Sequence, residues 1–154
     1  FFCKGVLETI KKLGWSPDII HCNDWMTSLI PMYLKTTYRK DPIFQSTKSV
    51  FSVYNNSFSH QFSADFAEKA RMIDIDDDMI AHLQQANFEN IVKTGIKYAD
   101  TVVSAEDEYS EKLQSLLNEM QCECKINHIP FASEEQNQAL SDSYYNLYHE
   151  LSSC

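Results

Sequence analysis

The stretch Ser-Pro-Asp-Ile-Ile-His-Cys-Asn-Asp-Trp, residues 16–25, decides the fold. Pro17 ends any preceding helix, because proline disfavours helical geometry in the residue before it. The apolar run at 18–22 is too short for a helix and rich in β-branched residues, which is typical of a strand buried on both faces. Asn23 or Asp24 can then cap a following helix. Strand, tight polar turn and helix form the unit from which parallel α/β sheets are built.

A second strand is predicted over residues 48–54, Lys-Ser-Val-Phe-Ser-Val-Tyr, which are mostly β-branched or aromatic. Tyr54 and Asn55 stand at its carboxyl end. Ligands of parallel α/β sheets bind beyond the carboxyl ends of the strands, so we expect both residues to face the same crevice as His21. The alternative for Tyr54 is a strand-end aromatic side chain that covers the core.

Helical and strand patterns alternate along the rest of the chain. Helices are predicted over residues 1–13, 24–37, 64–71, 76–85, 88–99, 106–120 and from 133 onward, with strands at 100–104 and 125–129. Pro31 either kinks the second helix or starts a second piece of it. The pattern predicts the α/β fold class: a Rossmann-like three-layer domain with a mainly parallel sheet, in which residues 1–154 form a single partial domain.

Several local features carry further expectations. Gly14 is expected to end the first helix in left-handed geometry. Ser104 with Asp107 resembles a capping box for the helix at 106. The loop at 58–66 is expected to expose its aromatic side chains. The four aspartates within 74–78 suggest a cation site, but they lack the glycine and distal glutamate of a calcium loop, so an acidic helix N-terminus is the favoured interpretation.

Charge and cysteine usage limit the classes of partner. The formal net charge is −9, so a polyanion is repelled at long range and nucleic acid is not an expected partner. No run of eighteen apolar residues exists, so no membrane partner is expected. The five cysteines, an odd number, are interpreted as reduced thiols, which fits a cytoplasmic protein. A zinc site at Cys122 and Cys124, with His128 nearby, is the alternative.

The chain begins Phe-Phe-Cys inside a helical pattern, so we interpret it as a fragment that lacks an N-terminal part. Its final helix, which ends at Cys154, is interpreted as a natural terminus that packs back on the domain. With only three glycines and neither G-x-G-x-x-G nor a P-loop, the chain can form no glycine-rich phosphate cradle. We therefore expect no cofactor, and no metal apart from the zinc alternative.

The end of the first strand leaves alternatives open. His21 there could hydrogen-bond either a ligand hydroxyl or a neighbouring loop. Asp24 is more often a helix cap than a catalyst at such a position. Trp25, directly after it, is expected in the core.

Four segments together resemble one known family. They are Phe-Phe-x-x-Gly-x-Leu-Glu from residue 1, Leu-Gly-Trp-x-Pro-Asp-Ile-Ile-His-Cys-Asn-Asp-Trp-Met-Thr-Ser-Leu-Ile-Pro from residue 13, Lys-Ser-Val-Phe-Ser-Val-Tyr-Asn from residue 48 and Asn-Ile-Val-Lys-Thr-Gly-Ile-Lys-Tyr-Ala-Asp-Thr-Val from residue 90. This set is similar to the N-terminal domain of bacterial glycogen and starch synthases, glycosyltransferase family 5. It is most similar to the short, single-domain versions of Bacteroidetes-type bacteria.

The resemblance implies a retaining glucosyltransferase of GT-B architecture, of which this chain is a partial N-terminal half. In that architecture two Rossmann-like domains close over ADP-glucose and the end of an α-1,4-glucan. The implied partners are therefore an α-glucan, a sugar nucleotide and a separate GT-B C-terminal domain.

The family motifs are matched in part. The first motif normally ends His-x-His-Asp-Trp-His and reads His-Cys-Asn-Asp-Trp-Met here, and the second, Thr-(Ile/Val)-His-Asn, ends Tyr-Asn. The resemblance thus places Tyr54 where the family has the catalytic histidine that holds the transferred glucose. It implies substrate binding by His21, Asn23, Asp24 and Asn55. Tyrosine can still donate to a sugar hydroxyl, but it is bulkier and holds its proton with a pKa of about 10.

Two parts of the family pattern have no counterpart in this sequence: the Lys-x-Gly-Gly loop and the C-terminal nucleotide-binding domain. A phosphate leaving group needs preorganised positive charge, an effect of about several kcal/mol. We therefore expect a glycogen/starch synthase-like glucosyltransferase domain (ADP-glucose to α-1,4-glucan) that is incomplete or inactive alone. The alternatives are a non-catalytic glucan-binding or regulatory module derived from that family, and a structural remnant of a lost enzyme.

Overall fold

Four parallel strands form the centre of the structure. The computed structural model describes residues 1–121, 124–130 and 137–153. The strands are β1 (Ile19–Asn23), β2 (Lys48–Val53), β3 (Thr101–Ser104) and β4 (Ile126–His128), arranged in the order β1-β2-β3-β4. All three neighbouring pairs are parallel. The predicted α/β class and parallel sheet are therefore confirmed.

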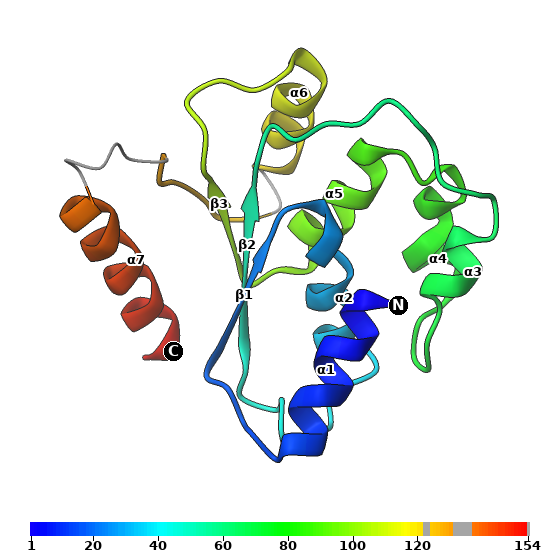
Figure 1. Cartoon of the computed structure of the whole chain (residues 1–154), viewed down its shortest axis with the longest axis horizontal. Coiled ribbons are helices and arrows are strands. Elements are labelled where there is room, and N and C mark those ends of the chain that lie inside the picture. The colour runs from blue at the N-terminus through cyan, green and yellow to red at the C-terminus, as the bar shows by residue number, and fades with distance from the viewer. Residues whose placement is uncertain (122–123, 131–136, 154) are drawn as a thin grey trace.

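Most helices cover one face of this sheet. They include α1 (Phe2–Leu13), α2 (Leu29–Lys35), α5 (Phe88–Tyr98) and α6 (Glu111–Met120), which share one large buried cluster with the sheet (Figure 1). Phe51 of β2 is fully buried at its centre. Gly95 of α5 lies so close to the Phe51 ring that an added Cβ would come within 2.6–2.8 Å of its carbons. This layer is close-packed.

The opposite face is covered, within the described residues, by α7 (Asn137–Ser152). Figure 1 shows α7, in orange and red, by itself on its side of the strands. Its Leu147 packs with Val50 of β2, Val103 of β3 and Ile129, which directly follows β4. The half-buried contacts are Ile19, Leu140, Tyr144, Tyr148 and Leu151. Parallel sheets are normally buried on both faces, so α7 completes a three-layer arrangement.

Short elements extend the thicker layer: η1 (Trp25–Thr27), α3 (Phe66–Ala70), α4 (Asp77–Ile80) and η2 (Ala81–Gln85). The predicted second helix is split into η1 and α2. Pro31 lies in the first turn of α2, where a helix leaves backbone N–H groups unpaired in any case. Gly14 ends α1 with φ of 65°, as predicted. Asp76 caps α4 by accepting from the Met79 amide at 3.0 Å, so the acidic run begins a helix.

The predicted capping box is wrong. Ser104 is the last residue of β3, and α6 begins only at Glu111. The loop between them is instead fixed from outside, because the Tyr109 hydroxyl donates to the carbonyl of Val53 at 3.0 Å. A tertiary contact has overridden a local capping signal.

The prediction of exposed aromatic side chains at 58–66 is also wrong for Phe58, Phe62 and Phe66, which are half-buried. Phe58 packs edge-on against Trp25 and Phe88, with ring centroids 4.9 and 5.5 Å apart. The loop thus forms part of the thicker layer.

The predicted last helix is described from Asn137, and its earlier residues, like Cys122, lie outside the described ranges. Among the residues described, no helix is long and apolar enough to cross a membrane. No group of three or more potential metal ligands occurs in the same part of the chain.

Candidate functional site

The candidate site lies where β1 and β2 end, between the sheet and α7. Side chains alternate between the two faces along a strand. His21 and Asn23 of β1 therefore share one face with Ser52 of β2 and with Tyr54, which directly follows β2. The residues between them, including Cys22 and Phe51, belong to the main core.

A cavity of about 210 Å³ opens at this point. Its described lining residues are His21, Asn23, Tyr54, Ala105, Ile129, Leu140, Tyr144 and Tyr148. The volume corresponds to about seven water molecules at ~30 Å³ each. It lies below the ~300–1,000 Å³ typical of drug-sized ligand sites. The described cavity is therefore small for a whole nucleotide.

Both ring nitrogens of His21 are engaged within the protein. Nδ1 lies 2.5 Å from the hydroxyl of Tyr148, and Nε2 lies 2.7 Å from the hydroxyl of the fully buried Ser52. Nearby, the Tyr54 hydroxyl donates to Asn23 Oδ1 at 3.1 Å. The Tyr144 ring also packs on His21, with centroids 5.5 Å apart. The histidine is thus held by hydrogen bonds from β2 and α7 together.

Burial keeps this site uncharged at neutral pH. It lowers the pKa of the His21 ring below the ordinary 6.5, so the imidazole is neutral. Burial also raises the pKa of Tyr54; neighbouring Tyr144 acts in the same direction, and a hydrogen bond from Ser52 opposes it. Burial likewise raises the pKa of Tyr148. The site thus brings neutral hydroxyl, amide and imidazole groups together beside aromatic rings.

Asp24 and Asn55 do not line this cavity. Asp24 has φ of 64° and ψ of 174°, a region that is nearly reserved for glycine and costs about 1–3 kcal/mol. Its two carboxylate oxygens accept from the Trp25 amide and from Asn56 Nδ2, each at 2.7 Å. Asp24 therefore caps η1 in this structure. Asn55 Oδ1 accepts from the Ser110 amide at 3.2 Å and fixes the start of α6.

Three residues of the site were missed by sequence reasoning: Ser52, Tyr144 and Tyr148. Ser52 could have been predicted, because side chains two residues apart on a strand share a face and Ser52 stands two residues before Tyr54. The tyrosines stand on the apolar stripe of the predicted last helix, but the sequence gives no sign of which surface that stripe covers.

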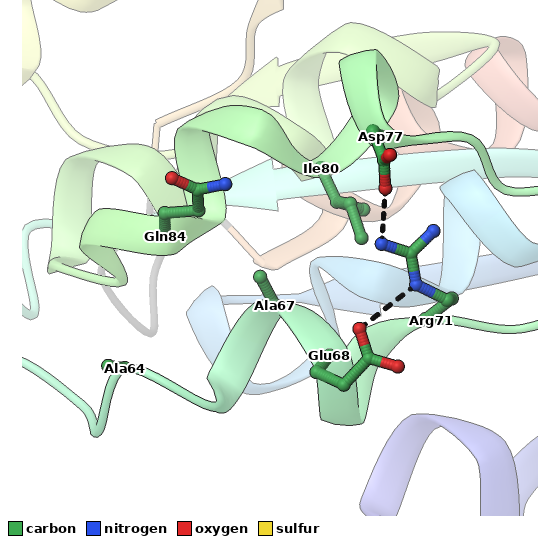
Figure 2. A pocket seen from close by; sticks show the side chains of 7 residues that line it. All are labelled: Ala64, Ala67, Glu68, Arg71, Asp77, Ile80 and Gln84. Atoms are coloured by element: carbon green, nitrogen blue, oxygen red, sulfur yellow. Dashed lines mark hydrogen bonds and ion pairs between the residues drawn. The ribbon is translucent and has the colours of Figure 1, made fainter.

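A larger hollow of about 360 Å³ lies between α3, α4 and η2 (Figure 2). Its basic side chain, Arg71, points between Glu68 and Asp77 and pairs with both. A third guanidinium donor reaches the Ile75 carbonyl. Because these carboxylates neutralise Arg71, this hollow offers no free positive charge to an anionic ligand.

The largest hollow described, about 440 Å³, is an apolar groove beside α1, lined by residues that include Phe2, Trp25 and Met26. It has few polar groups to orient a ligand. The buried hydroxyl of Ser28 is one, and it has no hydrogen-bond partner. The cavity at β1 and β2 is smaller, but it joins converging polar groups to aromatic walls.

Comparison with known families identifies the family of this chain. Residues 1–127 match the family described as starch synthase catalytic domain. The chain belongs to that family. Among curated relatives, it is 37% identical over 117 residues to the glycogen synthase of Desulforudis audaxviator, covering 75% of this chain and 23% of that protein. It is 36% identical over 115 residues to the glycogen synthase of Clostridium perfringens, covering 75% and 24%. The chain spans about a quarter of the length of these starch synthase family members.

A solved structure has the same fold. It is the catalytic domain of starch synthase IV from Arabidopsis thaliana bound to ADP and acarbose, with a TM-score of 0.61, 22% identity, and coverage of 82% of this chain and 28% of that chain. The likeness shows that the chain folds as part of a GT-B starch synthase domain. The predicted family is confirmed, and α7 lies beyond the residues that match the starch synthase family.

Proposed function

We propose that this chain is the sugar-binding part of a glycogen/starch synthase-type glucosyltransferase. In this proposal the cavity at the ends of β1 and β2 holds one glucose unit. One observation carries the proposal: His21, Asn23 and Tyr54, which stand at the family's motif positions, meet in one cavity with aromatic walls. Tyr54 takes the place of the family histidine beside the transferred glucose, and His21 and Asn23 orient the sugar from β1.

The chain alone is proposed to transfer no glucose. No lysine or arginine occurs in the described lining of the cavity, and the net charge of the chain is −9. A diphosphate leaving group develops negative charge that needs preorganised positive charge nearby. We propose that residues 1–154 form a single partial Rossmann-like domain that works in the cytoplasm with a separate GT-B C-terminal domain. That partner supplies the ADP side of the cleft.

Asp24 and Asn55 take indirect roles in this proposal. Asp24 fixes the sharp turn that ends β1, and so sets where Asn23 enters the cavity. Asn55 ties the end of β2 to α6. Neither side chain contacts the sugar.

A second candidate function is a non-catalytic glucan-binding or regulatory module. Tyr54 in place of the family histidine favours it, as do the two other tyrosines of the cavity, because aromatic faces bind sugar rings without any need for chemistry. Such a module binds maltooligosaccharide and has no use for ADP-glucose.

A transfer assay tests the first proposal. The chain is incubated with radiolabelled ADP-glucose and maltooligosaccharide, alone and with an added nucleotide-binding domain from a complete family member. We expect no transfer by the chain alone and measurable transfer with the added domain. Binding of maltooligosaccharide without transfer in either mixture would favour the glucan-binding module. Binding of neither sugar would contradict both functions.

The variant Tyr54→His sharpens the assay. It restores the family residue without adding any positive charge for the diphosphate, so we expect no transfer by the variant alone. Glucosyl transfer by that variant alone would show that the cavity needs no second domain.

A further inference from the structure

Both ring nitrogens of His21 have a hydroxyl partner within the protein. Nε2 lies 2.7 Å from the hydroxyl of the fully buried Ser52, and Nδ1 lies 2.5 Å from the hydroxyl of Tyr148. A hydroxyl group can donate or accept, so both contacts are satisfied in either neutral tautomer of the ring. The Tyr54 hydroxyl, nearby, donates to Asn23 Oδ1.

Tyr148 reaches His21 from a helix outside the family match, which ends at residue 127. The helix is held by apolar packing, since Leu147 lies against Val50, Val103 and Ile129. That packing does not depend on the Tyr148 hydroxyl. The hydroxyl therefore adds one specific feature to the site: it occupies the Nδ1 position of His21.

A hydroxyl group of a ligand in the cavity meets His21 in the same way. His21 and Tyr148 both line the cavity, so a sugar hydroxyl placed there approaches the nitrogen that Tyr148 already occupies. The described lining carries no charged side chain at neutral pH, so the ligand that competes is a neutral sugar rather than a sugar phosphate.

We propose that Tyr148 sets the affinity of the cavity for neutral sugars, because its hydroxyl occupies the hydrogen-bonding position on His21 Nδ1 that a sugar hydroxyl would take. This inference rests on the proposed sugar-binding function of the same cavity. Binding then exchanges one hydrogen bond for another at His21, and the Tyr148 hydroxyl must turn away. Removing that hydroxyl while keeping the ring takes away the competitor.

The test compares Tyr148→Phe with Tyr145→Phe. Tyr145 is a matched control, because it lies on the same helix, is 67% exposed and packs beside His149 away from the cavity. Each protein is labelled with ¹⁵N-histidine and titrated with glucose and maltotriose, and the Nδ1 and Nε2 signals of His21 are followed by NMR. We expect Tyr148→Phe to bind both sugars about three- to tenfold more tightly than the natural chain, and Tyr145→Phe to match the natural chain.

The outcomes separate this inference from the proposed function. Equal or weaker sugar binding by Tyr148→Phe would overturn the competitor role and leave the cavity as a sugar site. If no sugar shifts the His21 signals in any of the three proteins, both the competitor role and the sugar-binding function are wrong. Tighter binding by both variants would also overturn the inference, since Tyr145 does not touch His21.

Discussion

The two faces of the sheet differ in how they are filled. One face lies under several helices and is closed by large apolar side chains such as Phe51, with Gly95 pressed against its ring. The other lies under α7 and changes character along the strands, from the apolar Val50 to the polar Ser52. The first face therefore holds most of the buried apolar side chains, and the candidate site lies at the carboxyl end of the second.

The largest expected effect is the loss of stability when a buried leucine is replaced by alanine, which we compare between the two faces. Leu113→Ala removes a fully buried side chain from the thick layer, and we expect it to lower the free energy of unfolding by about 3–5 kcal/mol. Leu147→Ala acts in the small cluster under α7, where the helix can shift to close the gap, and we expect a loss of about 2–3 kcal/mol. Urea unfolding of both variants measures the difference. An equal loss, or the reverse order, would contradict the contrast between the faces.

A pair of glycines tests how tightly the thick layer is packed. Gly95→Ala forces the buried Phe51 ring to move, so we expect a net loss of about 1–3 kcal/mol despite the better helix propensity of alanine. Gly5→Ala is the control, since nothing lies within 4 Å of its added Cβ. We expect that variant to gain about 0.5–1 kcal/mol in thermal or urea unfolding. If Gly95→Ala does not lower the free energy of unfolding, this layer is packed less tightly than described.

The smallest expected effect concerns pH. Burial lowers the pKa of His21 on the thin face and of His82 on the thick face, where Lys97 and Lys93 act in the same direction. As the pH falls, these histidines are therefore protonated at a higher pH in the unfolded chain than in the folded one. The free energy of unfolding thus decreases as the pH drops below about 6.5. Urea unfolding between pH 5 and pH 8 measures the slope.

Single histidine variants show how much of the pH dependence of stability comes from each face. His21→Asn and His82→Asn each remove one proton-binding site, so each should flatten the fall in stability. A slope that survives in the double variant His21→Asn/His82→Asn would mean that other groups cause the acid sensitivity.

Much of the fold could be predicted because its signals are local. Pro17 and Gly14 mark the boundary between the first helix and the first strand, and both act through their own backbone geometry. The meeting of His21 and Tyr54 in one cavity was predictable too, because neighbouring parallel strands end at the same edge of a sheet.

The parts that sequence reasoning missed depend on contacts between distant segments. The amphipathic pattern of the last helix predicts a buried stripe but not that this stripe carries Tyr148 to His21, 127 residues away in sequence. Asp24 and Asn55 directly follow Asn23 and Tyr54, so the alternation of side chains along each strand already turns them away from the cavity, and they pair with Asn56 and Ser110 instead. The sequence prediction grouped these residues by their place at the strand ends and did not apply that alternation.

The most direct test of the account is where a sugar binds. Backbone amide signals of the ¹⁵N-labelled chain are followed during titration with maltotriose. We predict that the largest shifts fall on His21, Asn23, Tyr54, Tyr144 and Tyr148, around the cavity under α7. Shifts confined to the thick face, for example around Trp25 and Phe62 in the apolar groove, would contradict the claim that the thinly covered face carries the function.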